Sequence, residues 1–120
     1  MKVYISTPVN GRSEATLEKK REAAYRRVCQ IRRELERHWK RSEFHSAFDE
    51  HIAPIGMKEH KTEAEIMGQC ITAVIECSVV VLDYGWKSSR GCRMEANAAH
   101  IYGRKTMDAW FLNIKQEQQL

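Results

Sequence analysis

Apolar residues follow the spacing of β-strands in four parts of this 120-residue chain. Lys2–Ser6 alternates polar and apolar side chains and contains β-branched and aromatic residues, which predicts a first strand. Ser78–Leu82 is continuously apolar, as expected of a central parallel strand covered on both faces. Phe44–Phe48 has the pattern of a short second strand and Lys105–Phe111 that of a last strand.

A long amphipathic helix is predicted between the first two of these strands. Ser13 is suited to cap it, Glu14 favours its first turn, and it ends near His38–Arg41. Its apolar residues recur at spacings of four, three and four, which places them on one stripe. These residues are Ala24, Val28, Ile31 and Leu35.

Two further helices are predicted in the second half of the chain. Thr62 and Glu65 have the form of a capping box, which predicts a helix from about Glu63 to Glu76. We expect it to bury Ile66, Met67, Cys70, Ile71, Val74 and Ile75. The last helix begins near Ser89 or Arg90 and runs to Tyr102, where Gly103 is suited to end it.

Strands and helices therefore alternate from end to end, which predicts an α/β fold. The expected architecture is a flavodoxin-like or Rossmann-like three-layer sandwich with a mostly parallel sheet of four or five strands. We expect one domain over residues 1–120, with residues 115–120 as a frayed tail. Ligands of such sheets bind beyond the carboxyl ends of the strands, where the loops Thr7–Arg12 and Asp83–Ser89 should open.

Composition narrows the class of protein. A hydrophobic fraction of 42% and a charged fraction of 30% are ordinary for a folded domain and argue against disorder. The sequence contains no run of about 18 apolar residues and no apolar stretch suited to a secretion signal. We therefore expect a cytoplasmic protein that does not contact the membrane.

Neither the cysteines nor the histidines have the spacing of a metal site. The four cysteines form no C-x-x-C pair, so we expect them to be buried apolar groups rather than disulfides or zinc ligands. They are Cys29, Cys70, Cys77 and Cys92. His45, His51 and His60 fit no zinc motif and are expected at the surface, so the sequence predicts no metal and no cofactor.

The net charge of +4 is concentrated between Glu14 and Arg41. Glutamates interleave with the bases there, and Glu22 precedes Arg26 by four residues, a stabilising order on a helix. This favours a solvated helix face over a nucleic-acid surface, which would need aromatic residues or a binding motif beside the bases. A nucleic-acid partner is therefore not expected.

The loop Asp83–Ser89 is the first candidate for chemistry. It is polar and leads into a helix N-terminus, where backbone amides and the Ser89 hydroxyl suit a phosphate or another anion. Ser89 is equally suited to be only the helix cap. Glu95 follows among small and apolar residues, and its carboxylate lies either on the outer face or in the cleft. Because glutamates are mostly exposed, its residue type alone favours the outer face.

Two stretches of the chain resemble a known family. Tyr4–Gly11, YISTPVNG, is similar to the YISGPITG opening of nucleoside 2-deoxyribosyltransferase-like proteins. Ile66–Glu95 resembles the segment of that family with the spacing GW-x-x-S-x-G-x-x-x-E. The similarity points to a small bacterial and phage branch, related to deoxynucleoside monophosphate N-glycosidases.

The resemblance implies a role for individual residues. Glu95 matches the glutamate that attacks the anomeric carbon of the sugar, Tyr4 the tyrosine that positions it, and Ser89 the residue that holds the 5′ end. Arg90 beside Ser89 favours a phosphorylated ligand slightly. The implied substrate contacts are Thr7, Pro8, Asn10, Gly11, Arg12, Cys70, Gly85, Trp86, Ser89 and Gly91. Members usually form homodimers in which the partner completes each site.

The chain departs from the family in the residue that assists the leaving base. Cys70 stands where the family usually has an aspartate that protonates or binds the base, and Ser78 replaces a second aspartate. Loss of that acid costs about a hundredfold or more, and an ordinary thiol with a pKa near 8.5 is a poor replacement. Asp83 is a candidate substitute if it lies on the cleft rim; a solvated turn aspartate is the alternative.

Three functional hypotheses follow from the sequence. The first is an N-glycosidase or deoxyribosyltransferase that acts on a nucleoside or nucleotide through Glu95. The second is a nucleotide-binding or sensor module that kept the pocket without efficient chemistry. The third, a nucleic-acid-binding surface on the first helix, would show a steep dependence of affinity on salt.

Overall fold

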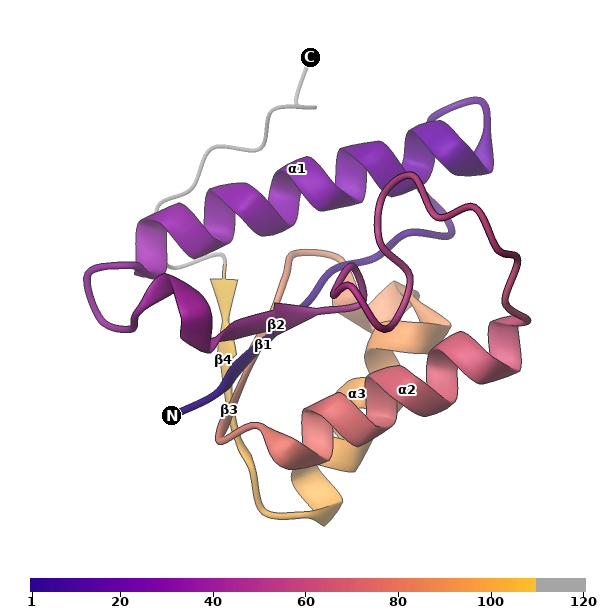
Figure 1. Ribbon diagram of the computed structural model, residues 1–120. Helices are drawn as coiled ribbons and strands as arrows, with labels where there is room; N and C mark the ends of the chain where they lie inside the picture. Colours follow the sequence, from indigo (N-terminus) through magenta and orange to yellow (C-terminus); the bar gives the residue numbers. More distant parts are fainter. Residues whose placement is uncertain (110–120) are drawn as a thin grey trace.

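The computed structural model describes residues 1–109 and confirms the predicted α/β architecture (Figure 1). The sheet has four parallel strands in the order β2-β1-β3-β4. Their bounds are β1 Val3–Ser6, β2 Phe44–Ser46, β3 Val79–Leu82 and β4 Lys105–Asp108. The end of the predicted last strand, at Phe111, and the predicted frayed tail lie outside the described residues.

Three helices cover the two faces of the sheet, so that the molecule has three layers (Figure 1). They are α1 Leu17–Leu35, α2 Glu63–Glu76 and α3 Arg90–Ile101. The side chains of β1 alternate between the faces: Val3 and Ile5 pack with α1, whereas Tyr4 packs with α2 and α3. None of the helices in residues 1–109 is both long and apolar enough to cross a membrane.

The capping box predicted for α2 is present. The Thr62 hydroxyl accepts a hydrogen bond from the Glu65 amide, and the Glu65 carboxylate accepts one from the Thr62 amide, both at 3.1 Å. These bonds satisfy two backbone N–H groups that a helix start otherwise leaves without partners. Cys70 and Val74 are buried as predicted, whereas Ile66, Met67, Ile71 and Ile75 are only partly buried.

Both predicted ends of α1 are wrong. Thr16, not Ser13, caps the helix, because its hydroxyl accepts a hydrogen bond from the Lys19 amide at 3.1 Å. At the other end α1 stops at Leu35, the last residue of the buried stripe. The stripe itself is confirmed, but Arg27 is buried beside it, so this base does not belong to a solvated face.

The segment between β2 and α2 is held by cations that bind backbone carbonyls. Arg21 of α1 donates to the carbonyl oxygens of Ala53 and Pro54. Lys61 donates to the carbonyls of His51 and Ile52, at 2.8 and 2.6 Å. The segment thereby inserts Ile52, which is fully buried, into the core below α2.

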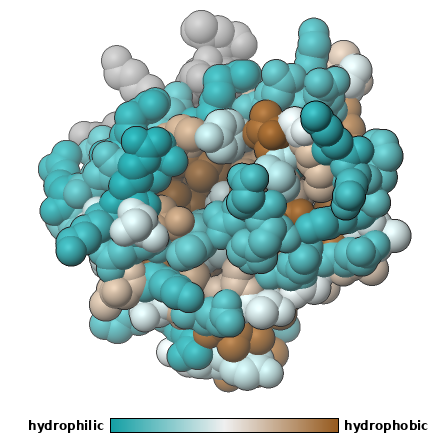
Figure 2. Space-filling view, viewed as in Figure 1, coloured by the Kyte–Doolittle hydropathy of each residue, from teal (hydrophilic) through white to brown (hydrophobic). Residues whose placement is uncertain are grey.

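The surface is largely hydrophilic on the side shown in Figure 2, with hydrophobic residues visible mainly in its hollows. His51 and His60 are exposed as expected, whereas His45 is half-buried, with its Nδ1 2.8 Å from the Asp49 carboxylate. All four cysteines are free; Cys70, Cys77 and Cys92 are buried, and Cys29 is half-buried.

Candidate functional site

The candidate site is built from strand β1 and helix α3. Tyr4 and Ser6 are two positions apart on β1, so both side chains face α3. The Tyr4 hydroxyl donates to Glu95 Oε2 and the Ser6 hydroxyl to Glu95 Oε1, each at 2.6 Å. Both oxygens of one carboxylate are therefore held by neutral hydroxyl donors.

Glu95 is buried, with 5% of its surface exposed. The expectation from residue type, an outer-face glutamate, is wrong, because Glu95 shares one face of α3 with the buried residues Cys92, Ala98 and Ala99. Burial raises the pKa of the Glu95 carboxyl, and hydrogen bonds from Ser6, Tyr4 and Cys70 act in the opposite direction. The carboxylate is thus kept from bulk water, and no cation among residues 1–109 pairs with it.

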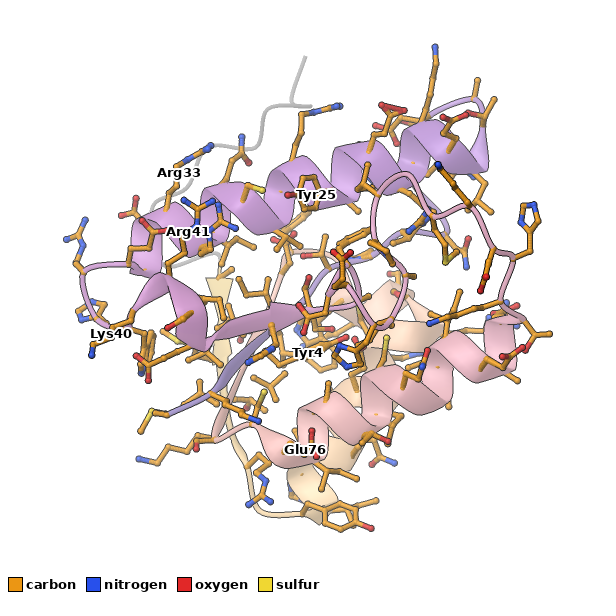
Figure 3. The ribbon with its side chains drawn as sticks, in the orientation of Figure 1. Tyr4, Tyr25, Arg33, Lys40, Arg41 and Glu76 are labelled. Atoms are coloured by element: carbon orange, nitrogen blue, oxygen red, sulfur yellow. The ribbon has the colours of Figure 1, made fainter. Side chains whose placement is uncertain are left out.

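Tyr4 is the stable donor in this arrangement. Its ring is completely buried, and burial together with the neighbouring Glu95 raises the pKa of its phenol well above the usual value. The phenol therefore stays protonated and donates at any physiological pH. Figure 3 labels Tyr4 in the interior of the molecule, on the first strand.

Cys70 of α2 lies beside the same pair. Burial raises the pKa of its thiol to about 12, and the nearby Glu95 carboxylate contributes in the same direction. Cys70 lines the same cavity as Tyr4 and Glu95 and is close enough to affect the pKa of both. At neutral pH it is therefore a protonated thiol, a weak donor with little tendency to release its proton.

A cavity of about 270 Å³ opens in front of Glu95. It lies at the carboxyl end of β1, where the strand order reverses between β1 and β3, as expected for this kind of sheet. Seven predicted site residues line it: Tyr4, Thr7, Asn10, Cys70, Ser89, Gly91 and Glu95. The apolar side chains of Val9, Ile66, Met67 and Phe48 provide much of the remaining wall.

The N-terminus of α3 forms one side of this cavity. The Ser89 hydroxyl accepts a hydrogen bond from the Cys92 amide at 3.3 Å, so it caps the helix. Ser89 also lines the cavity, as do Arg90 and Gly91 in the first turn. The two alternatives for Ser89 are therefore compatible, because a capping hydroxyl retains its own proton to donate to a ligand.

A charged pair stands at the mouth of the cavity. Arg90 lies 3.7 Å from Glu63 at the start of α2, and both side chains are largely exposed. Both residues line the cavity. Such an exposed pair contributes little to stability, so either group is available to an incoming ligand.

Five other predicted contacts do not line this cavity. Gly11 and Arg12 lie farther along the loop, and Arg12 is 3.4 Å from Glu14. Gly85 and Trp86 line a separate cavity at the ends of β3 and β4, where Trp86 Nε1 donates to Asp108 at 3.1 Å. Pro8 lies next to Gly85, whose φ of +86° suits glycine.

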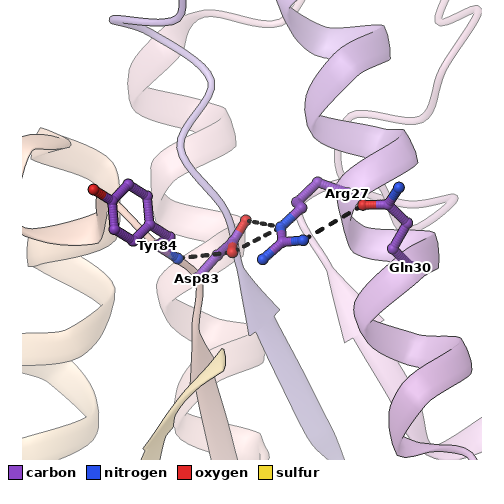
Figure 4. Close-up of polar contacts among 4 residues, drawn as sticks. All are labelled: Arg27, Gln30, Asp83 and Tyr84. Carbon is purple, nitrogen blue, oxygen red and sulfur yellow. Dashed lines mark hydrogen bonds and ion pairs between the residues drawn. The ribbon is translucent and has the colours of Figure 1, made fainter. Parts of the chain in front are cut away.

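Asp83 lies on the opposite face of the sheet from Glu95. It lines the separate cavity at the ends of β3 and β4 rather than the Glu95 cavity, and it is not solvated, because only 2% of its surface is exposed and Arg27 Nε donates to its two carboxylate oxygens at 2.9 and 3.1 Å (Figure 4). The Tyr84 amide donates to Oδ1 at 2.7 Å. Burial raises the pKa of the Asp83 carboxyl, and Arg27 opposes that effect. Asp83 is thus part of a buried ion pair outside the Glu95 cavity.

Ser6 is the site residue that the sequence did not single out. Its position two residues after Tyr4 on a predicted strand was the available signal, since such residues share a face. Within residues 1–109, no three His, Cys, Asp or Glu side chains are grouped as a metal site would require. The Glu95 carboxylate thus meets the hydroxyls of Tyr4 and Ser6, and the Cys70 thiol lines the same cavity.

Comparison with protein-family models matches residues 1–108 to one family, described as Domain of unknown function (DUF4406). Comparisons with curated proteins and with solved structures found no significant match. Every residue that lines the cavity around Glu95 falls within the matched range. The candidate site is therefore contained in the family domain.

Proposed function

The chain belongs to the DUF4406 family, and we propose that it cleaves or transfers the N-glycosidic bond of a nucleoside or nucleoside 5′-monophosphate. The observation that carries this proposal is the Glu95 carboxylate, buried at a cavity and held by two hydroxyls at 2.6 Å. The resemblance of Tyr4–Gly11 and Ile66–Glu95 to nucleoside 2-deoxyribosyltransferase-like proteins supports the same chemistry.

Glu95 is the nucleophile in this proposal. One carboxylate oxygen attacks C1′ of the sugar while the bond from C1′ to the base nitrogen breaks and its electron pair leaves with the base. Water, or a second base, then attacks C1′ and releases the carboxylate. Because Tyr4 and Ser6 are neutral, they fix the carboxylate without removing its charge, which a cationic partner would neutralise.

The leaving base must acquire a proton, and this step limits the proposed reaction. Cys70 is a weak acid because the pKa of its thiol is about 12. Asp83 is paired with Arg27 on the other face and does not reach the base. Efficient turnover is therefore expected only for a base that leaves readily or that takes its proton from water.

Cys70 also favours a second candidate function, a nucleotide-binding module without efficient chemistry. In that case the cavity retains its ligand because no acid completes the departure of the base. The residues at the start of α3, with the Arg90 guanidinium beside them, support a phosphorylated ligand in both proposals. The homodimer implied by the resemblance remains a prediction.

A panel of nucleosides and deoxynucleoside 5′-monophosphates, assayed for free base by chromatography, tests both functions. The glycosidase predicts release that Glu95→Ala lowers at least a thousandfold, whereas Glu76→Ala, an exposed glutamate on α2 (Figure 3), leaves it unchanged. The binding module predicts a raised melting temperature with one of these ligands and no free base. Release that survives in Glu95→Ala would disprove the enzymatic proposal.

A further inference from the structure

A second cavity, of about 190 Å³, lies between α1 and β2. Ile5, Val28 and Phe48 line both this cavity and the one at Glu95, so the two are neighbours with shared apolar walls. Figure 2 shows a hollow with hydrophobic atoms between the regions of α1 and β2, bordered by hydrophilic side chains. None of the residues proposed for catalysis lines this second cavity.

Two arginines from different elements line the cavity. Arg32 comes from α1, and Arg41 comes from the short 3₁₀-helix η1, Arg41–Glu43, that precedes β2. Arg32 Nε lies 3.4 Å from the half-exposed Glu36 one turn along the helix. Arg41 forms no ion pair with any residue in the described range 1–109. Positive charge therefore faces this cavity with only partial compensation.

Among the described residues that line this cavity, Asp49 supplies the carboxylate, and it is already hydrogen-bonded. Asp49 Oδ2 lies 2.8 Å from His45 Nδ1, and Asp49 Oδ1 accepts a hydrogen bond from the Ser46 amide at 3.1 Å. Both interactions belong to the turn that follows β2, so they are explained by local structure. The Asp49 carboxylate keeps its negative charge, so the cavity lining carries two guanidinium groups against one carboxylate.

Tyr25 adds a hydroxyl donor from α1. A hydrogen bond with Cys29 raises the pKa of its phenol, while Arg32 and Arg41 both act to lower it. Tyr25, Arg32 and Arg41 all line the cavity, so the phenol and the two guanidinium groups border the same space. In Figure 3 the Arg41 side chain extends from the segment before β2 toward α1, the helix that carries Tyr25.

We propose that this cavity binds a phosphate monoester, with its dianion held by Arg32, Arg41 and the Tyr25 hydroxyl. Guanidinium groups match the oxygens of a phosphate in bidentate geometry, and a phenol supplies a further donor. The apolar walls formed by Val28, Phe44 and Phe48 suit a small organic group attached to the phosphate. Glu95 does not line this cavity, so a test of phosphate binding here is separate from a test of the proposed glycosidic chemistry.

Inorganic phosphate is the probe for this site, titrated into the ¹⁵N-labelled protein at constant ionic strength with chloride as the background anion. We expect saturable shifts at residues 25, 32, 41 and 45. Arg41→Gln should weaken binding at least tenfold, as should Arg32→Gln. Arg33→Gln is the matched control, because this exposed arginine on α1 carries the same charge but does not line the cavity. It should change the affinity less than twofold.

Arg90→Gln distinguishes binding in the second cavity from binding at the start of α3. It should leave the affinity of the second cavity for phosphate unchanged. Equal weakening in the Arg33 and Arg41 variants would show a general charge effect and overturn the proposal. Shifts confined to residues 89–92 would overturn it in favour of the first cavity. The titration runs from a roughly 20-fold excess of phosphate over protein up to roughly tens of millimolar phosphate. Absence of saturable shifts over this range would also overturn the proposal.

Discussion

Glu95 and Asp83 are two buried carboxylates on opposite faces of one sheet, and they have different partners. Asp83 is held by the guanidinium of Arg27, whereas Glu95 is held by the hydroxyls of Tyr4 and Ser6. For both, burial is the largest cause that raises the pKa of the carboxyl. Glu95 lines the cavity of about 270 Å³ that contains most of the predicted site residues, whereas Asp83 lines the separate cavity at the ends of β3 and β4.

The difference separates a structural carboxylate from a reactive one. A guanidinium compensates the charge of Asp83 and hydrogen-bonds both of its oxygens, which makes this carboxylate a weaker nucleophile. Hydroxyl donors fix the Glu95 carboxylate in place and leave its charge uncompensated. An uncompensated buried charge destabilises a fold. In this protein that destabilisation occurs at Glu95, where the charge faces a cavity and can act on a ligand.

Removing the cation tests this comparison with the largest expected effect on stability. Arg27→Met leaves the charge of Asp83 buried without its partner, so we expect the free energy of unfolding at pH 7 to fall by about 3–5 kcal/mol. Because Arg27 acts to lower the pKa of Asp83, its loss raises that pKa further, and the deficit should shrink as the pH falls and Asp83 takes up a proton. Urea denaturation at pH 7 and pH 5 measures both effects.

The double variant Arg27→Met/Asp83→Leu is the control for that experiment. It replaces the pair by apolar groups and should recover most of the lost stability. A single Arg27→Met variant that loses less than about 1 kcal/mol, the usual value for an exposed pair, would contradict the structural role assigned here.

Tyr4→Phe removes one of the two hydroxyls from Glu95. The hydrogen bond from Tyr4 acts to lower the pKa of the carboxyl, so its loss raises that pKa further. The nucleophile must be ionised, so the acidic limb of the pH–rate profile should move to higher pH, and base release at pH 7 should fall about tenfold or more.

Tyr102→Phe, in an exposed tyrosine beyond α3, should leave the pH–rate profile unchanged. A Tyr4→Phe variant with reduced turnover but an unmoved acidic limb would mean that the phenol only supports the packing of the core. The two results are distinguished by measuring the complete profile rather than a single pH.

Glu95→Gln should produce the smallest effect, a gain in stability. Burial raises the pKa of the Glu95 carboxyl above its usual value of 4.5. The group therefore contributes stability that is fully present below pH 4.5 and is lost as the pH rises through the raised pKa. A neutral amide avoids this loss. At pH 7 we expect a gain of about 1 kcal/mol in the free energy of unfolding, and no gain below about pH 4.

Thermal unfolding of Glu95→Gln and of the exposed control Glu76→Gln across this pH range provides the measurement. A gain at pH 4 that equals the gain at pH 7 would show that ionisation of Glu95 is not its cause. A loss at pH 7 would show that the two hydroxyls compensate the charge fully.

The fold was predictable from the sequence because its signals are local. The continuous apolar run at β3 and the capping box at Thr62 each depend on residues a few positions apart. The start of α1 was missed because Ser13 and Thr16 are both good capping residues, and local propensity does not choose between them. Only the hydrogen bond from Lys19 to Thr16 settles that choice.

The candidate site was predictable only in part, because it depends on contacts between distant segments. Residue type alone placed Glu95 outside, and the resemblance to a family, not periodicity, suggested the cleft. The partner of Asp83 is 56 positions earlier in the chain, on a helix whose bases looked uniformly solvated. Alternation along β1 placed Ser6 beside Tyr4, but nothing local indicated that both would meet one carboxylate.

Arg21 and Lys61 bind residues 51–54, between β2 and α2, through main-chain oxygens. Every amino acid supplies such an oxygen, so the fastening does not depend on which side chains follow Ile52. Residues 54–60 are therefore free to diverge among relatives while Ala47 and Phe48 keep their place at the cavity wall. Variation in this stretch would alter the outer surface of the protein without reshaping the space in front of Glu95.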